Sequence, residues 1–367
     1  MEFEPLDTAY LQTLRVSESH SEPDGAARET VLPFADSTTP SPSADATLDL
    51  NATAHAQQLL MLGYEQYQAL QYETALETLK QAYEQSVACA DVEGQSKALA
   101  YIGLTFYTLK HYSKAIEYSQ TALVLANQTQ DQRTAVKILS TLGNAYRHLK
   151  NPDRAIEYQL QSLTLSKAVG DRYSEMAALN NLGLAYKAVG QLEQAIAYEE
   201  QSLQLATDLQ EPQLEEQILK NLGNACYSLG NYAKAIAYYE RRLRLAEQMS
   251  DFRLEMQILR NLGNACYALG HYERSIECGE QRLRLARLLQ DLRAEEQSLG
   301  SIAVGYDSLG NYARAIEYYQ QRLSVAQQLR DWRIEEQVLG SLKVAYYALG
   351  DYLKATEYAN QRQMMSR

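Results

Sequence analysis

A forty-residue period constrains this chain more than any other feature of its sequence. The stretch from Asn221 to Ile236 returns almost unchanged as Asn261 to Ile276, and eight copies of the period fit the chain without an insertion. A period of this length is typical of stacked units, each of which buries its apolar face only against its neighbours. The sequence therefore predicts a solenoid and not two or three globular domains. A Leu-Gly pair keeps the frame at Gly63, Gly103, Gly143, Gly183, Gly223 and Gly263, and then changes at Ala303 and Lys343.

Each unit has the pattern of two helices joined by a short turn. Helix A is expected to start after a capping residue and to run for about eighteen residues to a glycine such as Gly230, whose left-handed conformation ends it. Helix B follows, with Tyr232, Ala235 and Tyr239 at three- and four-residue spacing on one apolar face. Two helices in each of eight copies predict an all-α fold of sixteen antiparallel helices. The expected caps of helix A are Asn51, Asp91, Asp131, Asp171, Asp251, Asp291 and Asp331, with Glu211 as the exception.

These columns resemble the signature of the tetratricopeptide repeat family, in which Leu-Gly is followed by an aromatic residue and then by alanine. Tyr146, Tyr186 and Tyr306 keep the aromatic residue, and Ser275 is the one departure from the alanine column. The resemblance covers residues 51–367. It implies an α-solenoid, a right-handed superhelix of eight helix-turn-helix repeats with the A helices on its inner wall. The strings Leu-Gly-Asn-Ala, Ala-Ile-Glu-Tyr and Glu-Gln-Arg-Leu are similar to those of Pins-type polarity scaffolds and of bacterial arrays.

The N-terminal segment differs in composition from the repeats. Residues 1–50 carry ten acidic residues against two arginines, with clusters of Ser, Thr and Pro, so we expect a disordered acidic tail before a repeat domain at residues 51–367. The chain has a net charge of −12, which disfavours nonspecific binding to nucleic acid. The acidic start lacks the long apolar core of a signal peptide, and no stretch of the chain is apolar enough to insert into a membrane. We therefore expect a cytoplasmic protein.

No pattern in the chain indicates catalysis or a bound cofactor. We find neither a glycine-rich phosphate loop nor a Ser or Cys nucleophile with a positioned His, and the four cysteines form no C-x-x-C pair. The carboxylates follow the forty-residue period, whereas catalysis needs one unique site. We therefore expect a protein that is not an enzyme and that holds neither a metal nor a cofactor.

The helix A positions that lie beside or opposite the recurring Leu-Gly pair form the expected binding surface. Asparagine both donates and accepts hydrogen bonds, so a column of asparagines can bind the main chain of an extended peptide, while Lys220 and Arg260 can bind carboxylates. The resemblance implies a groove position for the Asn after Leu-Gly. The alternative is that these residues are merely tolerated on a solvated inner face. The candidate residues are Asn144, Arg147, Asn180, Asn181, Lys187, Lys220, Asn221, Asn224, Tyr227, Arg260, Asn261, Asn264 and Tyr267.

A second column of candidates lies in helix B, at Arg242, Arg282 and Arg322. The resemblance implies that the arginine of Glu-Gln-Arg-Leu reaches the edge of the groove and contacts a partner. The alternative is a structural ladder in which these arginines pair with acids of helix A, and both interpretations can hold together. The acids expected in such a ladder are Glu215, Glu255, Glu295 and Glu335.

The sequence thus predicts a scaffold or adaptor with an assembly or signalling role, which binds a peptide or protein segment in the concave groove. The expected ligand is acidic or polar with an apolar anchor, because cationic and amide side chains line the middle repeats and apolar ones the first. One alternative is a structural scaffold that self-associates through its C-terminal repeat. A second alternative is a peptide-sensing regulator or a partner of a separate effector enzyme.

Overall fold

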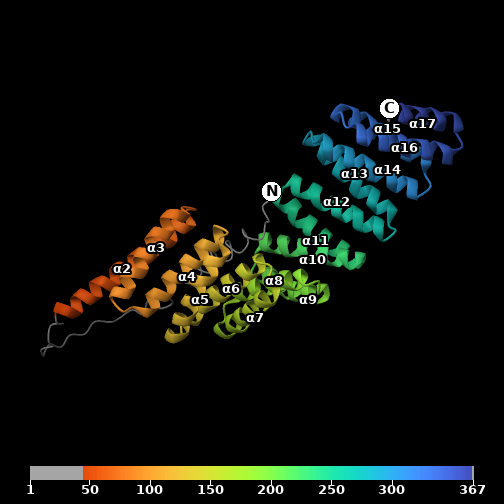
Figure 1. Ribbon diagram of the computed structural model, residues 1–367. Helices are drawn as coiled ribbons and strands as arrows, with labels where there is room; N and C mark the ends of the chain where they lie inside the picture. The colour runs from red at the N-terminus through yellow and green to blue at the C-terminus, as the bar shows by residue number, and fades with distance from the viewer. Residues whose placement is uncertain (1–43, 366–367) are drawn as a thin grey trace, which may run out of the picture. The chain divides into compact units, whose positions relative to one another are not determined.

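The computed structural model describes residues 44–365, with side chains from residue 52 onward. This part of the chain holds sixteen helices and no strand, which confirms the all-α prediction (Figure 1). The helices are α2 (Ala44–Gln68), α3 (Tyr72–Ala88), α4 (Val92–Thr108), α5 (Tyr112–Thr129), α6 (Gln132–His148), α7 (Pro152–Val169), α8 (Arg172–Ala188), α9 (Leu192–Asp208), α10 (Pro212–Ser228), α11 (Tyr232–Met249), α12 (Phe252–Ala268), α13 (Tyr272–Leu288), α14 (Leu292–Ser308), α15 (Tyr312–Leu329), α16 (Trp332–Leu349) and α17 (Tyr352–Met365).

The chain forms two compact units that divide inside α10, at residues 1–214 and 215–367. Even-numbered helices are the A helices of the repeats, and odd-numbered helices are the B helices. Within each unit, helices that follow one another in the chain pack side by side. In the N-terminal unit, A helices of neighbouring repeats also touch, as α2 touches α4 and α4 touches α6. This is the nearest-neighbour packing that the period predicts.

The helix ends follow the predicted chemistry with one exception. The side chain of Asp91 accepts a hydrogen bond from the Gly94 N–H at 2.9 Å, and Gly230 has a left-handed φ of +75° after α10. The exception is Asn51, which we expected at the cap of the first helix. Helix α2 begins at Ala44 and runs through Asn51 because no glycine or proline interrupts the segment between them.

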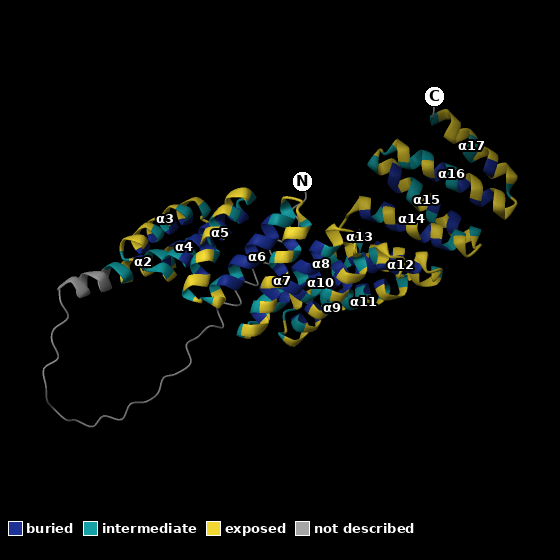
Figure 2. Ribbon diagram, turned by 60° about the horizontal axis from the view of Figure 1, so that its bottom comes forward, coloured by how far each residue is buried: buried dark blue, intermediate teal, exposed yellow. Residues whose placement is uncertain are grey.

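Close packing between the two helices of a repeat depends on the Leu-Gly column. A Cβ atom at Gly223 would overlap the ring of Tyr239, which is itself 2% exposed. The buried residues line the faces where helices meet, while the exposed residues lie on the outward faces (Figure 2). The alanine column contributes the smallest buried side chains, with Ala75, Ala115, Ala155, Ala195, Ala235 and Ala315 at most 1% exposed.

Among the residues that the structure describes, none of the helices has the length and apolar character that a membrane span requires.

Candidate functional site

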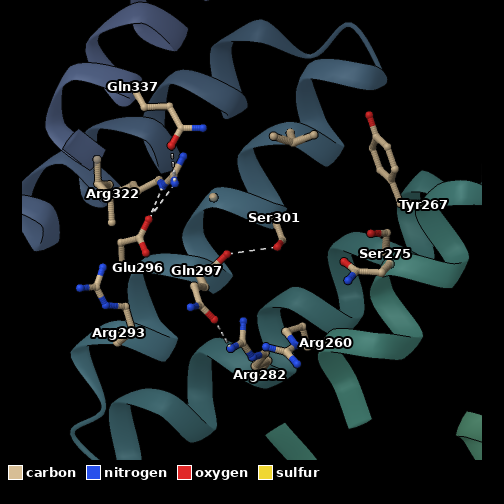
Figure 3. Close-up of a pocket in the computed structure, with 14 residues that line it drawn as sticks. Arg260, Tyr267, Ser275, Arg282, Arg293, Glu296, Gln297, Ser301, Arg322 and Gln337 are labelled. Carbon is tan, nitrogen blue, oxygen red and sulfur yellow. Dashed lines mark hydrogen bonds and ion pairs between the residues drawn. The ribbon is translucent and has the colours of Figure 1, made fainter. Parts of the chain in front are cut away.

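The C-terminal unit contains a cavity of about 620 Å³ between α12 and α16 (Figure 3). Three A helices supply most of its wall from positions that repeat every forty residues. The cavity therefore lies on the helix A face that the sequence predicts as the binding surface. Its lining residues are Arg260, Asn264, Tyr267, Ser275, Arg282, Arg293, Glu296, Gln297, Gly300, Ser301, Val304, Arg322, Ile334 and Gln337.

Five of the predicted partner-binding residues meet at this cavity. Arg260, Asn264 and Tyr267 come from α12, and Arg282 and Arg322 come from the B helices α13 and α15. The α12 residues are exposed, and the hydroxyl of Tyr267 lies 2.9 Å from that of Ser308. The site thus combines guanidinium groups, an amide and an aromatic ring on one face.

An arginine ladder runs through the unit beside this cavity. In the B helices α11 and α15 a guanidinium contacts a carboxylate 26 residues earlier: Arg242 contacts Glu216 at 2.6 Å, and Arg322 contacts Glu296 at 2.7 Å. Arg362 of α17 repeats the contact with Glu336 at 3.1 Å. Each pair joins helix B to helix A of the same repeat, and removal of either partner would leave a buried or half-buried charge unpaired.

Arg282 lacks the carboxylate that the other arginines of the ladder have. The position 26 residues before it is Met256, a buried apolar residue. Arg282 is 7% exposed, and its Nη2 donates to Oε1 of Gln297 at 2.8 Å, while its buried Nε has no hydrogen-bond partner among the described residues. Burial lowers the pKa of the Arg282 guanidinium, and the neighbouring charge of Arg260 lowers it further.

Comparison with known families agrees with these repeats. Two models described as the tetratricopeptide repeat match the chain, one over residues 134–208 and 214–287 and the other over residues 298–331. The chain is a tetratricopeptide repeat protein. No curated protein matches it.

Solved structures of other proteins show a similar fold. A signal transduction ATPase with numerous domains and a tetratricopeptide repeat sensor, from Pyrococcus horikoshii, is 16% identical with a TM-score of 0.57, over 99% of this chain and 53% of its own. This chain thus spans about half the length of that protein. The C-terminal part of a repeat protein from Cytophaga hutchinsonii is 16% identical with a TM-score of 0.56, over 72% of this chain and 95% of its own. BtubC from P. vanneervenii is 20% identical with a TM-score of 0.51, over 60% of this chain and 92% of its own.

Several residues predicted to contact a partner of this tetratricopeptide repeat protein are buried in the structure. Asn144, Asn181 and Asn221 are 2%, 6% and 8% exposed. Arg242 is 1% exposed and is held by Glu216. Their contact with a partner stays a prediction.

The remaining candidates lie at the surface but outside the cavity. Arg147 contacts the neighbouring His148 at 3.1 Å, and Asn224 accepts a hydrogen bond from the hydroxyl of Tyr239 at 2.8 Å. The other members of this group are partly or fully exposed, namely Asn180, Lys187, Lys220, Tyr227 and Asn261.

The acids that we expected in the ladder are displaced by one residue. Glu215 pairs with Arg241 at 2.8 Å, and Glu295 pairs with Arg287 at 2.7 Å. A shift of one residue turns a helical side chain by about 100°, so neighbouring glutamates in the same helix serve different arginines. The ladder itself is confirmed, with Glu216, Glu296 and Glu336 as its acids.

Sequence reasoning missed the polar residues that complete the cavity, above all Gln297 and Gln337. Both belong to a glutamine column that also contains Gln257, and each accepts a hydrogen bond from the arginine 15 residues before it, at 2.8 Å for Gln297 and 3.4 Å for Gln337. The recurrence of this glutamine was a usable signal. The sequence contained no signal for the arginine that bonds to this glutamine, because a repeat position does not indicate which other repeat position it faces in the fold.

Proposed function

We propose that this tetratricopeptide repeat protein is a non-catalytic scaffold or adaptor that binds a peptide or protein segment on the face formed by its A helices. The observation that carries the proposal is the cavity, whose exposed Arg260, Asn264 and Tyr267 come from one predicted surface. Ligand sites in proteins are concave, with a few polar groups converging on a partly apolar wall, and the cavity has this character. Its guanidinium groups favour an acidic or polar segment, and Val304 and Ile334 offer an apolar contact.

The domain organisation that accompanies this proposal is a repeat domain at residues 51–367 and an acidic tail at residues 1–50. Residues 1–43 of that tail lie outside the described part of the chain. We propose a cytoplasmic location for the protein, in line with the sequence analysis. An assembly, signalling or peptide-sensing role, or a partnership with a separate effector enzyme, would use the same binding face.

Selection of ligands from a peptide library tests the binding function. Immobilised full-length protein should enrich peptides of a common pattern, and the double change Asn264→Ala with Tyr267→Ala should weaken their binding by about tenfold or more, because each lost hydrogen bond contributes about 0.5 to 1.5 kcal/mol. Arg314→Ala is the matched control, since Arg314 is exposed on α15 and pairs with Glu317 away from the cavity. Failure to enrich any peptide, or equal binding by the double variant, would argue against the proposal.

A second candidate function is self-association through the C-terminal repeat. Large apolar side chains on α16 and α17 are exposed, including Tyr347 at 63%, Leu353 at 74% and Met364 at 76%. Exposed apolar surface of this kind favours contact with another protein surface, and here we propose a second copy of the chain. Sedimentation equilibrium should then show a dimer that Leu353→Glu dissociates. A monomer at micromolar concentration would leave the peptide-binding scaffold as the function.

A further inference from the structure

We infer that Arg282 is the anchor of a carboxylate subsite in the C-terminal cavity, and that the bound peptide supplies the carboxylate. The inference rests on the proposed peptide-binding function and assigns to one place in the array the acidic group of the ligand. It also distinguishes Arg282 from Arg242 and Arg322, which the sequence presents as equivalent.

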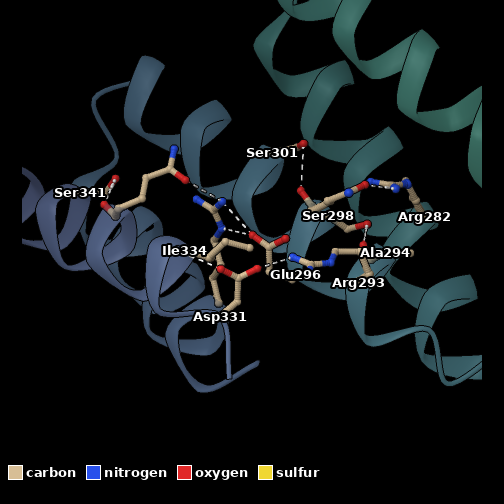
Figure 4. A network of polar contacts seen from close by, with 12 residues as sticks. Arg282, Arg293, Ala294, Glu296, Ser298, Ser301, Asp331, Ile334 and Ser341 are labelled. Carbon is tan, nitrogen blue, oxygen red and sulfur yellow. Dashed lines mark hydrogen bonds and ion pairs between the residues drawn. The ribbon is translucent and has the colours of Figure 1, made fainter. Parts of the chain in front are cut away.

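The charges around the cavity are unequal. Four arginines line it against one acid, Glu296. Glu296 is bound by Arg322 at 2.7 Å, and Arg293 is bound to Asp331 at 2.9 Å, so two of the four guanidinium groups are neutralised within the protein (Figure 4). Asp291 is near enough to affect Arg282, but its side chain caps α14 by accepting from the Ala294 N–H at 2.9 Å.

The two other guanidinium groups of the cavity remain without an acidic partner. Neither Arg260 nor Arg282 has a carboxylate within 4.0 Å in the part of the chain that the structure describes. The two groups lie close together on α12 and α13, near enough that the charge of one affects the other (Figure 3). An anion bound between them would relieve this repulsion.

The other repeats show which kind of anion the position accepts. In three repeats the equivalent guanidinium contacts a glutamate carboxylate, with separations of 2.6, 2.7 and 3.1 Å. Repeat 6 has Met256 at the glutamate position, which leaves a buried cation without its carboxylate. A buried charge is costly unless it is paired, so a carboxylate that enters the cavity restores the arrangement of the other repeats.

Neutral donors around Arg282 complete the subsite. Oε1 of Gln297 accepts from Nη2 of Arg282 at 2.8 Å, which leaves the Gln297 amide N–H groups to donate to a ligand. The amide of Asn264 is exposed on the facing helix and lines the same cavity. A guanidinium and two amides can together satisfy both oxygens of one carboxylate.

A small probe tests the subsite separately from peptide binding. Propionate is titrated into full-length protein labelled with ¹⁵N in its arginines, at constant ionic strength, and the Nε–H signal of Arg282 is followed, with propionamide as the neutral control. The Arg282 signal, identified by its absence in Arg282→Gln, should move with saturation under propionate and stay fixed under propionamide. A signal that moves equally with both probes, or with neither, overturns the inference.

Variants at Met256 test whether Arg282 binds a carboxylate because this repeat lacks the glutamate of the other repeats. Met256→Glu supplies the carboxylate found in the other repeats, so it should fold, as checked by its melting curve, and should weaken propionate binding at least tenfold. Met256→Gln is of similar size and neutral, and it should retain binding. Equal affinity of the wild type and Met256→Glu would overturn the inference.

Two blocked amino acids then identify the source of the carboxylate. N-acetyl-glutamic acid α-amide carries only a side-chain carboxylate, and N-acetyl-alanine carries only a terminal one. We expect the first to bind more tightly, because glutamate side chains fill the equivalent position in the other repeats. Preference for N-acetyl-alanine would contradict the side-chain source. Loss of peptide enrichment with propionate binding intact would count against the proposed function and not against the subsite.

Discussion

Repeats 5 and 6 have nearly the same helix A sequence but different polar contacts. In repeat 5 (residues 211–250), Tyr239 donates to Asn224 and Glu216 holds Arg242. In repeat 6 (residues 251–290), the matching positions are Gly279 and Met256, so Asn264 is exposed and Arg282 has no acid. Both differences lie outside the stretch that the two repeats share. The common columns thus build the repeat, while two departures from the period deprive Asn264 and Arg282 of the partners that Asn224 and Arg242 have in repeat 5.

The largest expected effect comes from making repeat 5 resemble repeat 6. Glu216→Met would leave Arg242, which is 1% exposed, without its carboxylate. Removing one partner of a buried ion pair costs about 3 to 5 kcal/mol, and we expect a loss of that size in the free energy of unfolding of the C-terminal unit. Urea unfolding followed by circular dichroism measures it. A loss below about 1 kcal/mol would show that the ladder contributes little.

The same comparison in the N-terminal unit contrasts Gln159 with Glu199. Both are 1% exposed at matching positions of repeats 3 and 4, but both carboxylate oxygens of Glu199 have no hydrogen-bond partner among the described residues. Burial raises the pKa of Glu199 from 4.5 to about 8. Below pH 4.5 the carboxyl is neutral in both the folded and unfolded states, and from pH 4.5 to about 8 only the unfolded state ionises, so stability falls as pH rises through this window.

Glu199→Gln should therefore remove this pH dependence and raise the free energy of unfolding at pH 8 by about 2 to 4 kcal/mol. Thermal unfolding of both proteins at pH 5 and pH 8 checks the result. The reverse change in repeat 3, Gln159→Glu, should introduce the same dependence. Parallel pH profiles for the wild type and Glu199→Gln would contradict the assigned burial.

A smaller effect is expected from the glycines that repeats 5 and 6 share. A Cβ at Gly223 would overlap the Tyr239 ring, whereas a Cβ at Gly263 would lie 3.4 Å from the Cβ of Cys278, an ordinary contact. Gly223→Ala should lower the free energy of unfolding by about 1 to 3 kcal/mol through overpacking. Gly263→Ala should be neutral or should stabilise by up to about 1 kcal/mol, since alanine favours a helix interior. Identical changes in melting temperature would remove this difference between the repeats.

The smallest effect concerns the hydrogen bond that repeat 5 makes and repeat 6 lacks. Tyr239→Phe removes the 2.8 Å bond from the hydroxyl to Oδ1 of Asn224 and should cost about 0.5 to 1.5 kcal/mol of stability. Tyr232→Phe is the control, because its hydroxyl makes no hydrogen bond among the described residues. Equal unfolding midpoints for the two variants would indicate that the bond to Asn224 contributes nothing.

The sequence by itself determined the architecture of this protein. The period of forty residues predicts the paired helices, and the aspartates and glycines predict most of their ends, because these features depend on neighbours within one or two turns. Asn51 was the exception, since the helix there starts earlier. The sequence also predicted which face of the A helices carries Arg260, Asn264 and Tyr267, because side-chain direction repeats with the helical turn.

The tertiary structure decided which columns face each other. Asn144, Asn224 and Asn264 occupy one column, yet the first is 2% exposed, the second is bound and the third is exposed. The residue 15 positions later decides the outcome: Gln159 donates to Asn144 at 3.4 Å, Tyr239 donates to Asn224, and Gly279 has no side chain. The ladder acids, 26 residues before their arginines, follow the same rule. A contact between two helices depends on their mutual rotation, and packing sets that rotation, so no local pattern contains it.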